Sequence, residues 1–394
     1  MKSKARAVPT SRQLPFHVPH RSSQQAAYVG QVLSSGSLRP GGIFSRKVEA
    51  WLVQHTGAGQ AIPTHSCTGA MEMAALALGL VSGDEVIVPT FTFCATATAF
   101  ERTGAQIVFC DIDPVTMMID PEDLERRISQ RTKAIVVVHY GGASADMEAI
   151  GAIAQRHGVH IIEDAAQGFG STRGGRALGS FGTFGAYSFH ETKVVSCGQG
   201  GALIVNTNDP VLLERISMVI ERGTDYARVR SGDKAFYEWT SPGSSFQLGE
   251  LEAAILMAEF EDLEENLTHR TRIATGMTEA LVQMPLPFAI LRPDALTTSN
   301  FHFVAALART EATAASLMAH MRSSGIDCRQ HYVPLHLSPR ARKMGYGPPS
   351  LPGAEQAWRR LVRLPVHTSM QEIDVQHCYK SALKFDASRG KIPG

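Results

Sequence analysis

Short apolar runs alternate with amphipathic stretches along the chain between residues 70 and 205. The runs are rich in β-branched and other apolar side chains, as the strands of a buried sheet are. They span residues 85–89, 106–111, 134–140, 159–164, 186–190 and 202–206. The stretch at 121–129 opens with proline and acidic residues, and the stretch at 147–158 ends in glycine, which is typical of helix starts and helix ends. The pattern therefore predicts an α/β fold with a mainly parallel sheet covered by helices on both faces.

The pattern changes after residue 206. Two long helical stretches are predicted at 210–221 and 248–272. The segment between them is polar and glycine-bearing, with scattered aromatic residues, and it predicts a long loop. Beyond residue 275 strands are fewer, with candidates at 301–307 and 326–335. We interpret this C-terminal part as a second, smaller α/β domain.

Domain boundaries follow from this change in pattern. The first residues, MKSKARAVPTSRQ, are basic and are not followed by the apolar segment of a secretory signal. They predict a disordered tail, with an organelle transit peptide as the alternative. The expected organisation is a tail at residues 1–20, a large domain at 21–265 and a small domain at 266–394, since a chain of this length suits two domains.

Composition changes this picture little. The chain has 394 residues, of which 44% are hydrophobic and 19% are charged, as in an ordinary globular protein. Its formal net charge of +1 offers no electrostatic basis for binding nucleic acid or an anionic membrane surface, and no apolar run is long enough to span a bilayer. The six cysteines form no CxxC pair. This favours reduced thiols in a cytoplasmic protein over a disulfide or zinc framework, and no metal site is expected.

Two short stretches carry residue types that suggest ligand binding. In HSCTGAMEMAALALGL, Ser66 or Thr68 can cap a helix, and the small Gly69 lets a ligand approach backbone amides that form an anion site. An ordinary capped helix explains the same stretch. In IIEDAAQGFGS, Asp164 follows an apolar run and Gln167 lies one turn later, which is where ligands bind in open parallel sheets. Aspartates at strand ends also serve as simple helix caps.

A third stretch, SFHETKVVSCGQGG, surrounds Lys193 with small residues and glycines. These leave room for a bulky planar ligand just after the predicted strand at 186–190. A lysine in such a pocket can have a lowered pKa and act as an amine nucleophile toward carbonyl groups, whereas a surface lysine on a loop is the alternative interpretation. Together, an anion site, a strand-end carboxylate and a pocket lysine are what pyridoxal phosphate (PLP) requires for its phosphate, its pyridine nitrogen and its aldehyde.

Longer motifs make the chain resemble the PLP-dependent nucleotide-sugar aminotransferases of the DegT/DnrJ/EryC type. The matching segments occur in order over most of the chain. They are SCTGAMEMAALAL, GDEVIVPTFTFCATATA, AIVVVHYGG, IIEDAAQGFGSTRGGRALGSFGTFGAYSFHETK, GQGGALIVN and HYVPLH. Through SFHETK and HYVPLH the chain is most similar to the dTDP-4-amino-4,6-dideoxygalactose transaminases of bacterial surface-polysaccharide synthesis. The resemblance implies PLP-dependent transferase fold type I, similar to aspartate aminotransferase, with a large sheet domain and a smaller C-terminal domain.

The resemblance also implies roles for individual residues. Lys193 matches the lysine that forms the Schiff base with PLP, and Asp164 matches the carboxylate that faces the pyridine nitrogen. The other matches are cofactor contacts. They are Gln167 at the 3-hydroxyl, Phe93 stacked on the ring, and Thr68, Gly69 and Ser188 at the phosphate.

Five further positions are carried over from the family. Gln247 stands where many members use an asparagine of the second subunit to complete the phosphate site, and glutamine can still donate an N–H. His331 and Tyr332 match positions that meet the sugar substrate. His190 and Glu191, which flank the lysine, are as consistent with structural roles as with catalytic ones.

The implied activity is amino transfer in two half-reactions. L-glutamate is the expected amino donor and a keto-sugar nucleotide the acceptor, with amination at C4 of a dTDP-4-keto-6-deoxyhexose to give a dTDP-4-amino-4,6-dideoxyhexose. Lys193 is expected to move the proton of the donor α-carbon, while Asp164 keeps the ring nitrogen protonated. Related dehydratases carry histidine at the lysine position, so Lys193 favours amino transfer. The family also implies a homodimer with a shared active site.

Several alternatives stay open. Related enzymes aminate C3 of a keto-sugar, or a keto-inositol, with nearly the same residues. A catalytically silent regulatory member is a further alternative, although the sequence shows neither a basic patch nor a helix-turn-helix for DNA and retains the lysine, the aspartate and the phosphate stretch. Schiff-base chemistry on Lys193 without PLP, as in class I aldolases, would leave Asp164 and the stretch around Thr68 and Gly69 without a role.

Overall fold

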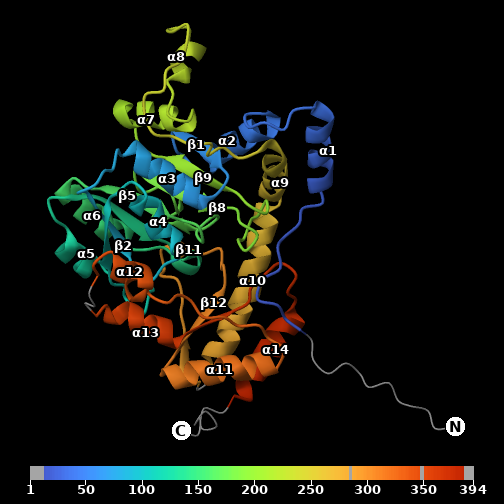
Figure 1. Cartoon of the computed structure of the whole chain (residues 1–394). Coiled ribbons are helices and arrows are strands. Elements are labelled where there is room, and N and C mark those ends of the chain that lie inside the picture. Colours follow the sequence, from blue (N-terminus) through green and yellow to red (C-terminus); the bar gives the residue numbers. More distant parts are fainter. Residues whose placement is uncertain (1–12, 284–285, 347–349, 386–394) are drawn as a thin grey trace.

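The computed structural model describes residues 13–283, 286–346 and 350–385 of the chain. Its centre is a seven-stranded sheet in which all strands except β9 run in the same direction (Figure 1). In their order across the sheet the strands are β1 (Gln60–Thr64), β9 (Gly201–Val205), β8 (Phe184–Ser188), β5 (His160–Asp164), β4 (Thr132–Val138), β2 (Glu85–Pro89) and β3 (Gln106–Cys110). The predicted mainly parallel sheet is therefore observed. Strand β1, which contains Pro63, was not predicted.

Side chains alternate between the two faces of the sheet and build a separate core on each. Val86 and Val88 of β2 belong to one core, and Ile87 between them belongs to the other. The first core is covered by α3 (Cys67–Ala77), α4 (Ala95–Glu101) and α7 (Pro210–Ile220), and the second by α5 (Pro121–Arg127) and α6 (Met147–His157). A third apolar cluster joins the β1–β9–β8 end of the sheet to α1 (Gln25–Ser35), α2 (Ile43–Thr56) and α9 (Glu250–Glu261).

The C-terminal part forms a smaller antiparallel sheet packed against helices. Its strands, in order, are β10 (Phe288–Ile290), β12 (Val304–Ala308) and β13 (Leu361–Leu364). The long helix α10 (Leu263–Val282) runs from α9 into this part of the molecule (Figure 1). The neighbouring helices are α11 (Glu311–Ser323), α12 (Pro339–Lys343), α13 (Pro352–Arg360) and α14 (Glu372–Leu383). Among the described helices, none is both long and apolar enough to cross a membrane.

Short elements complete the chain. Strands β6 (Thr172–Arg173), β7 (Arg176–Ala177) and β11 (Thr297–Thr298) form a small sheet. Single 3-10 turns lie at η1 (Tyr140–Gly142) and η2 (Leu335–Leu337). The long segment predicted as a loop contains one short helix, α8 (Tyr226–Arg230), which projects from the body of the molecule in Figure 1.

Two expectations about helices and strands need correction. The helix predicted at 248–272 is two helices, because the chain breaks at Asp262 between α9 and α10. The strand predicted at 326–335 is wrong: the segment is irregular and makes only isolated bridges, from Ile326 to Leu14 and from Arg329 to Arg363, within the described residues.

The predicted disordered tail is wrong for residues 13–20, because Leu14 is buried and its backbone pairs with Gly325 and Asp327. Residues 1–12 lie outside the described residues. The predicted boundary between residues 265 and 266 falls inside α10, and the division into two domains stays a prediction.

One buried carboxylate holds the strands that carry the candidate site. Glu163, fully buried next to Asp164 in β5, accepts hydrogen bonds from the backbone amides of Gly179 (2.7 Å), Phe181 (2.5 Å) and Gly182 (2.6 Å). His139, also fully buried, lies 2.8 Å from the same carboxylate. The bound turn leads directly into β8, so Glu163 positions β8 beside β5.

We expect Glu163→Gln to destabilise the protein by about 1–3 kcal/mol, because an NH₂ group replaces an oxygen that accepts buried N–H groups. The measurement is the urea midpoint of the first unfolding transition, followed by circular dichroism. Glu279→Gln, at an exposed position of α10, is the matched control and should move the midpoint little. Equal midpoints for the two variants would contradict this role of Glu163.

Candidate active site

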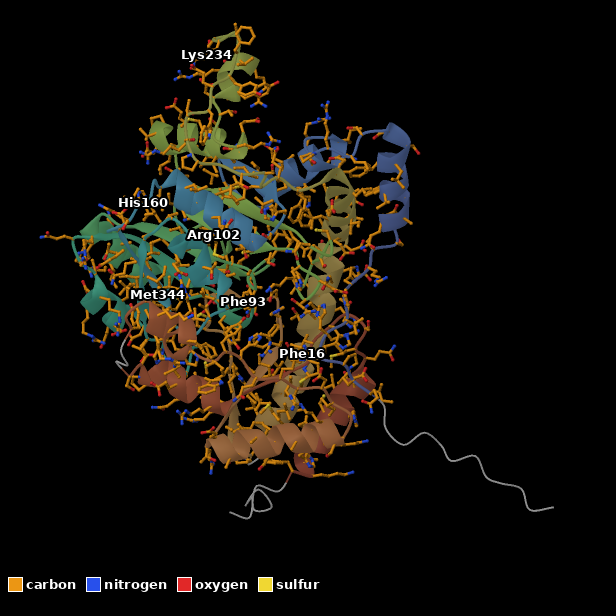
Figure 2. The ribbon with its side chains drawn as sticks, viewed as in Figure 1. Phe16, Phe93, Arg102, His160, Lys234 and Met344 are labelled. Carbon is orange, nitrogen blue, oxygen red and sulfur yellow. The ribbon has the colours of Figure 1, made fainter. Side chains whose placement is uncertain are left out.

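A cavity of about 630 Å³ lies at the carboxyl edge of the large sheet. Its walls come from the start of α3, from the end of β4, from the segments that follow β2, β5 and β8, and from the N-terminal and C-terminal parts. In Figure 2, Phe93 and Phe16, which both line it, lie between the sheet and the C-terminal elements. In open parallel sheets ligands bind beyond the carboxyl ends of the strands, so topology alone favours this edge.

The start of α3 forms one wall of the cavity. Ser66 caps the helix, because its hydroxyl accepts a hydrogen bond from the Gly69 amide at 3.0 Å. Within the described residues the amides of Cys67 and Thr68 find no acceptor, and both residues line the cavity together with Ser188. Free amides at a helix N-terminus favour an anion, so these groups could hold a phosphate.

Gly69 does not line the cavity, and its predicted contact with the phosphate stays a prediction. Its amide is already taken by the cap. A Cβ atom at this position would lie 2.9 Å from the ring of His65, so the glycine serves the packing between α3 and His65. Gly201 serves the same region, since a Cβ there would lie 2.3 Å from the backbone of Ser66.

Asp164 ends β5 and places a buried carboxylate in the cavity wall. One oxygen accepts a hydrogen bond from the hydroxyl of Thr96 at 2.7 Å, and the other accepts from the amide of Ala166 at 3.1 Å. Thr96 is itself bonded to Thr92 at 2.8 Å. Thr96 was not recognised from the sequence, because nothing in its local pattern links it to a residue 68 positions away. These bonds fix the direction of the carboxylate.

Lys193 follows β8 and faces the same cavity. Its backbone amide bonds to His190 at 2.9 Å, which holds the bend that carries the side chain. The ammonium group makes no hydrogen bond or ion pair within the described residues. Burial lowers the pKa of Lys193 and the charge of Arg363 lowers it further, while Cys67 and Asp164 act in the opposite direction. The net effect favours the neutral amine, which is the nucleophilic form.

Aromatic and amide groups form the opposite wall. Gln167 donates a hydrogen bond to the Tyr332 hydroxyl at 3.1 Å and accepts one from the amide of Gly141 at 2.8 Å. Tyr332 stacks on His331 with ring centroids 3.9 Å apart, and burial lowers the pKa of His331. Phe93 lines the cavity with 58% of its surface exposed, so a ring face is available to a planar ligand.

These groups fit PLP. Counting the described residues only, the cavity offers free amides and a hydroxyl for a phosphate, a fixed carboxylate for a protonated pyridine nitrogen, and an amine without a partner for an aldehyde. An exposed aromatic face is available for the ring. The structure thus brings most of the predicted contact residues into one cavity. They are Thr68, Phe93, Asp164, Gln167, Ser188, Lys193, His331 and Tyr332.

The remaining predicted residues make other contacts, and several residues of the cavity wall were not predicted. Gln247 does not line the cavity of its own chain and instead forms a backbone bridge to Thr64, so its predicted place in a second subunit stays a prediction. His190 lines the cavity, whereas the backbone carbonyl of Glu191 lies 2.6 Å from Nε2 of His17. Several wall residues were missed because only tertiary folding brings them there. They are Phe16, His17, His302, Arg329 and Arg363.

Comparison with known proteins places these observations in a family context. A profile of the DegT/DnrJ/EryC1/StrS aminotransferase family matches residues 19–382. The spore coat polysaccharide biosynthesis protein SpsC of Bacillus subtilis (strain 168) is 34% identical over 373 residues, covering 92% of this chain and 94% of SpsC. A pleiotropic regulatory protein of Geobacillus stearothermophilus is 35% identical over 346 residues, covering 87% and 90% of the two chains.

A solved structure is also similar. The aminotransferase TlmJ from Streptoalloteichus hindustanus superposes with a TM-score of 0.86 at 28% identity, over 96% of this chain and 99% of TlmJ. Three predictions are thereby confirmed: the fold type I architecture, the aminotransferase activity and the cofactor PLP. The roles of individual residues stay predictions.

Lys193 should react as a neutral amine at lower pH than an exposed lysine, because burial lowers its pKa below the ordinary 10.5. The measurement is reductive methylation of PLP-free protein by formaldehyde at a series of pH values, with peptide mass spectrometry to follow each lysine. The methylation rate at Lys193 should reach half its maximum at a pH below 10.5. The exposed Lys133 provides the reference in the same sample. Coincident pH profiles for the two lysines would contradict this direction.

Asp164→Asn should weaken PLP retention on the order of 10- to 100-fold, because it removes the charged partner of the ring nitrogen. Thr96→Val should weaken PLP retention less, because the carboxylate of Asp164 keeps its charge but loses the hydrogen bond that fixes its direction. Equilibrium dialysis against PLP measures both. Thr98→Val, on the exposed side of the same helix, is the matched control. Wild-type retention by Asp164→Asn would refute its assignment.

Proposed function

The chain belongs to the DegT/DnrJ/EryC1/StrS aminotransferase family, and from that premise we propose that it moves the amino group of L-glutamate to C4 of a dTDP-4-keto-6-deoxyhexose. The observation that carries amino transfer is the unpaired Lys193 amine in one cavity with the fixed carboxylate of Asp164. The C4 position is supported by the resemblance through SFHETK and HYVPLH. The name of SpsC supports a role in surface-polysaccharide synthesis.

Each part of the cofactor has candidate partners in the cavity. Lys193 would hold the aldehyde, Asp164 the pyridine nitrogen and Gln167 the 3-hydroxyl. Phe93 would cover a ring face, and the start of α3 with Ser188 would hold the phosphate. When bound, PLP supplies an electron sink and a carrier for the amino group.

The protein's own groups then move the protons. Lys193 would accept the proton of the donor α-carbon at Nζ, and the lowering of its pKa by burial favours the neutral form that can do so. Asp164 keeps a proton on the pyridine nitrogen, with Thr96 holding the carboxylate in place. Tyr332 and Phe93 add aromatic surface to the cavity wall, with ring centroids 6.4 Å apart.

The proposal includes a homodimer in which Gln247 completes the phosphate site of the second subunit. Gln247 pairs with Thr64, two residues before the cap of α3, so it lies beside the anion-binding end of the cavity without lining it. A glutamine side chain at this position can donate an N–H to a phosphate oxygen.

A regulatory protein is the second candidate, because one relative at 35% identity carries that name. The cavity argues against a silent chain. It keeps a buried amine that is unpaired among the described residues, together with a fixed carboxylate, and both are costly to retain without a ligand. Amination at C3 of a keto-sugar, or of a keto-inositol, is a finer alternative that differs only in the acceptor.

The test is the absorption of the PLP-loaded enzyme in two separate half-reactions. L-glutamate alone should bleach the visible band, and dTDP-4-keto-6-deoxyglucose should then restore it. A C3-keto-sugar nucleotide and a keto-inositol are the comparison acceptors, and Lys193→Ala, which should show neither change at a catalytic rate, is the control. If a comparison acceptor restores the band and dTDP-4-keto-6-deoxyglucose does not, the C4 assignment is refuted. A band that glutamate leaves unchanged would refute the donor.

A further inference from the structure

Arg363 of β13 is buried in the cavity wall, and its side chain has no hydrogen-bond or ion-pair partner in the described part of the chain. Only 4% of its surface is exposed, and its Nε atom has no hydrogen-bond partner. Within the described residues its guanidinium makes no hydrogen bond and no ion pair. The group is held by two aromatic faces, with its central carbon 4.7 Å from the ring centroid of Phe16 and 5.0 Å from that of Phe303. A buried, unpaired charge is costly, so such a group is expected to meet an anion.

A second arginine lies directly opposite. The backbones of Arg329, in an irregular segment, and of Arg363, in β13, exchange hydrogen bonds of 3.1 and 2.8 Å, so the two residues are directly opposed and both line the cavity. Arg329 also lies over Phe16, at 5.1 Å, and it lines the cavity. Like charges at directly opposed positions repel. Asp327 neutralises Arg329 through a 2.9 Å ion pair, but nothing in the described part of the chain neutralises Arg363.

The rest of the cavity wall supplies no counter-charge. Asp164 is the one carboxylate among the described wall residues, and its two oxygens are occupied by Thr96 and Ala166. The charge of Arg363 contributes to lowering the pKa of His302 and of His331, after burial. The cavity therefore presents an uncompensated positive charge beside the amine of Lys193.

We propose that Arg363, assisted by Arg329, binds a carboxylate of the substrate. A guanidinium packed over the rings of Phe16 and Phe303 keeps its N–H groups for a ligand, and their fork matches the two oxygens of a carboxylate. The carboxylate belongs either to the amino donor or to an acidic keto-sugar. The inference rests on the proposed function, because it takes the cavity as the place where donor and acceptor react.

Equilibrium binding tests the site without turnover. Glutarate, a dicarboxylate that cannot react, is titrated into the PLP-loaded enzyme by calorimetry, with uncharged 1,5-pentanediol as the reference ligand. Arg363→Gln should weaken glutarate binding on the order of 10- to 100-fold. Arg359→Gln, at a surface position of neighbouring α13, is the matched control and should bind glutarate like the wild type.

Folding is controlled in the same samples. Glutarate should raise the melting temperature of the wild type and of Arg359→Gln, but not that of Arg363→Gln. If Arg363→Gln does not fold, Arg363→Lys keeps the charge but loses the fork, and its glutarate affinity should be lower than that of the wild type. Equal glutarate affinity in wild type and folded Arg363 variants overturns the proposal. Arg363-dependent binding of dTDP without binding of glutarate also overturns it, in favour of a phosphate site.

The two half-reactions identify the source of the carboxylate. If L-glutamate bleaches the band of Arg363→Gln more slowly while a neutral keto-sugar restores it normally, the carboxylate is that of the donor. If Arg363→Gln slows only the reaction with a keto-uronic acid nucleotide, the bound carboxylate is that of the sugar. If both half-reactions keep wild-type rates in Arg363→Gln, the proposal fails. If L-glutamate does not bleach the visible band of the wild-type enzyme, the proposed donor is refuted. The glutarate titration still decides the role of Arg363 in that case.

Discussion

The structure depends on parallel pairing between β5 and β8. This pairing brings Asp164 and the segment that carries Lys193 to the same edge of the sheet, although 29 positions separate them in the chain. The buried carboxylate of Glu163 holds the turn before β8 through three backbone amides. Asp164, its neighbour in β5, points to the other face, because side chains alternate along a strand. One strand thus supplies both the structural anchor and the candidate partner of the cofactor.

Within the cavity, acid and base are close without neutralising each other. The carboxylate of Asp164 is bound by Thr96 and Ala166, whereas the amine of Lys193 has no partner in the described residues. Burial acts on the lysine more than the nearby carboxylate does, so its pKa falls. This balance suits an enzyme whose lysine must alternately hold an aldehyde and carry a proton. The positive charge of Arg363 also lowers the pKa of Lys193.

The strands of the large sheet were predictable because their apolar runs are strong local signals, as at 85–89, where prediction and structure agree. The cap of α3 was predicted at Ser66 or Thr68, and the structure places it at Ser66. Lys193 was singled out by the small residues and glycines around it, and the structure places it in the cavity wall. Strand β1 was not predictable, because Pro63 is rare in strands. Thr96 and Arg363 could not be found, because each reaches the cavity only through contacts between segments distant in sequence. The failure at 326–335 has a related cause: the segment makes single-residue bridges, to Leu14 and to Arg363 of the edge strand β13, and no continuous strand pairing.

The central claim is that PLP is held by Lys193 in this cavity. The most direct measurement is borohydride reduction of the PLP-loaded protein, followed by proteolysis and mass spectrometry of the peptides. Reduction makes the lysine–cofactor bond permanent, so the modified residue can be identified. A single phosphopyridoxyl group on Lys193 is the expected result. Modification of another lysine, or of none in a protein that retains PLP, would contradict the assignment of this cavity as the active site.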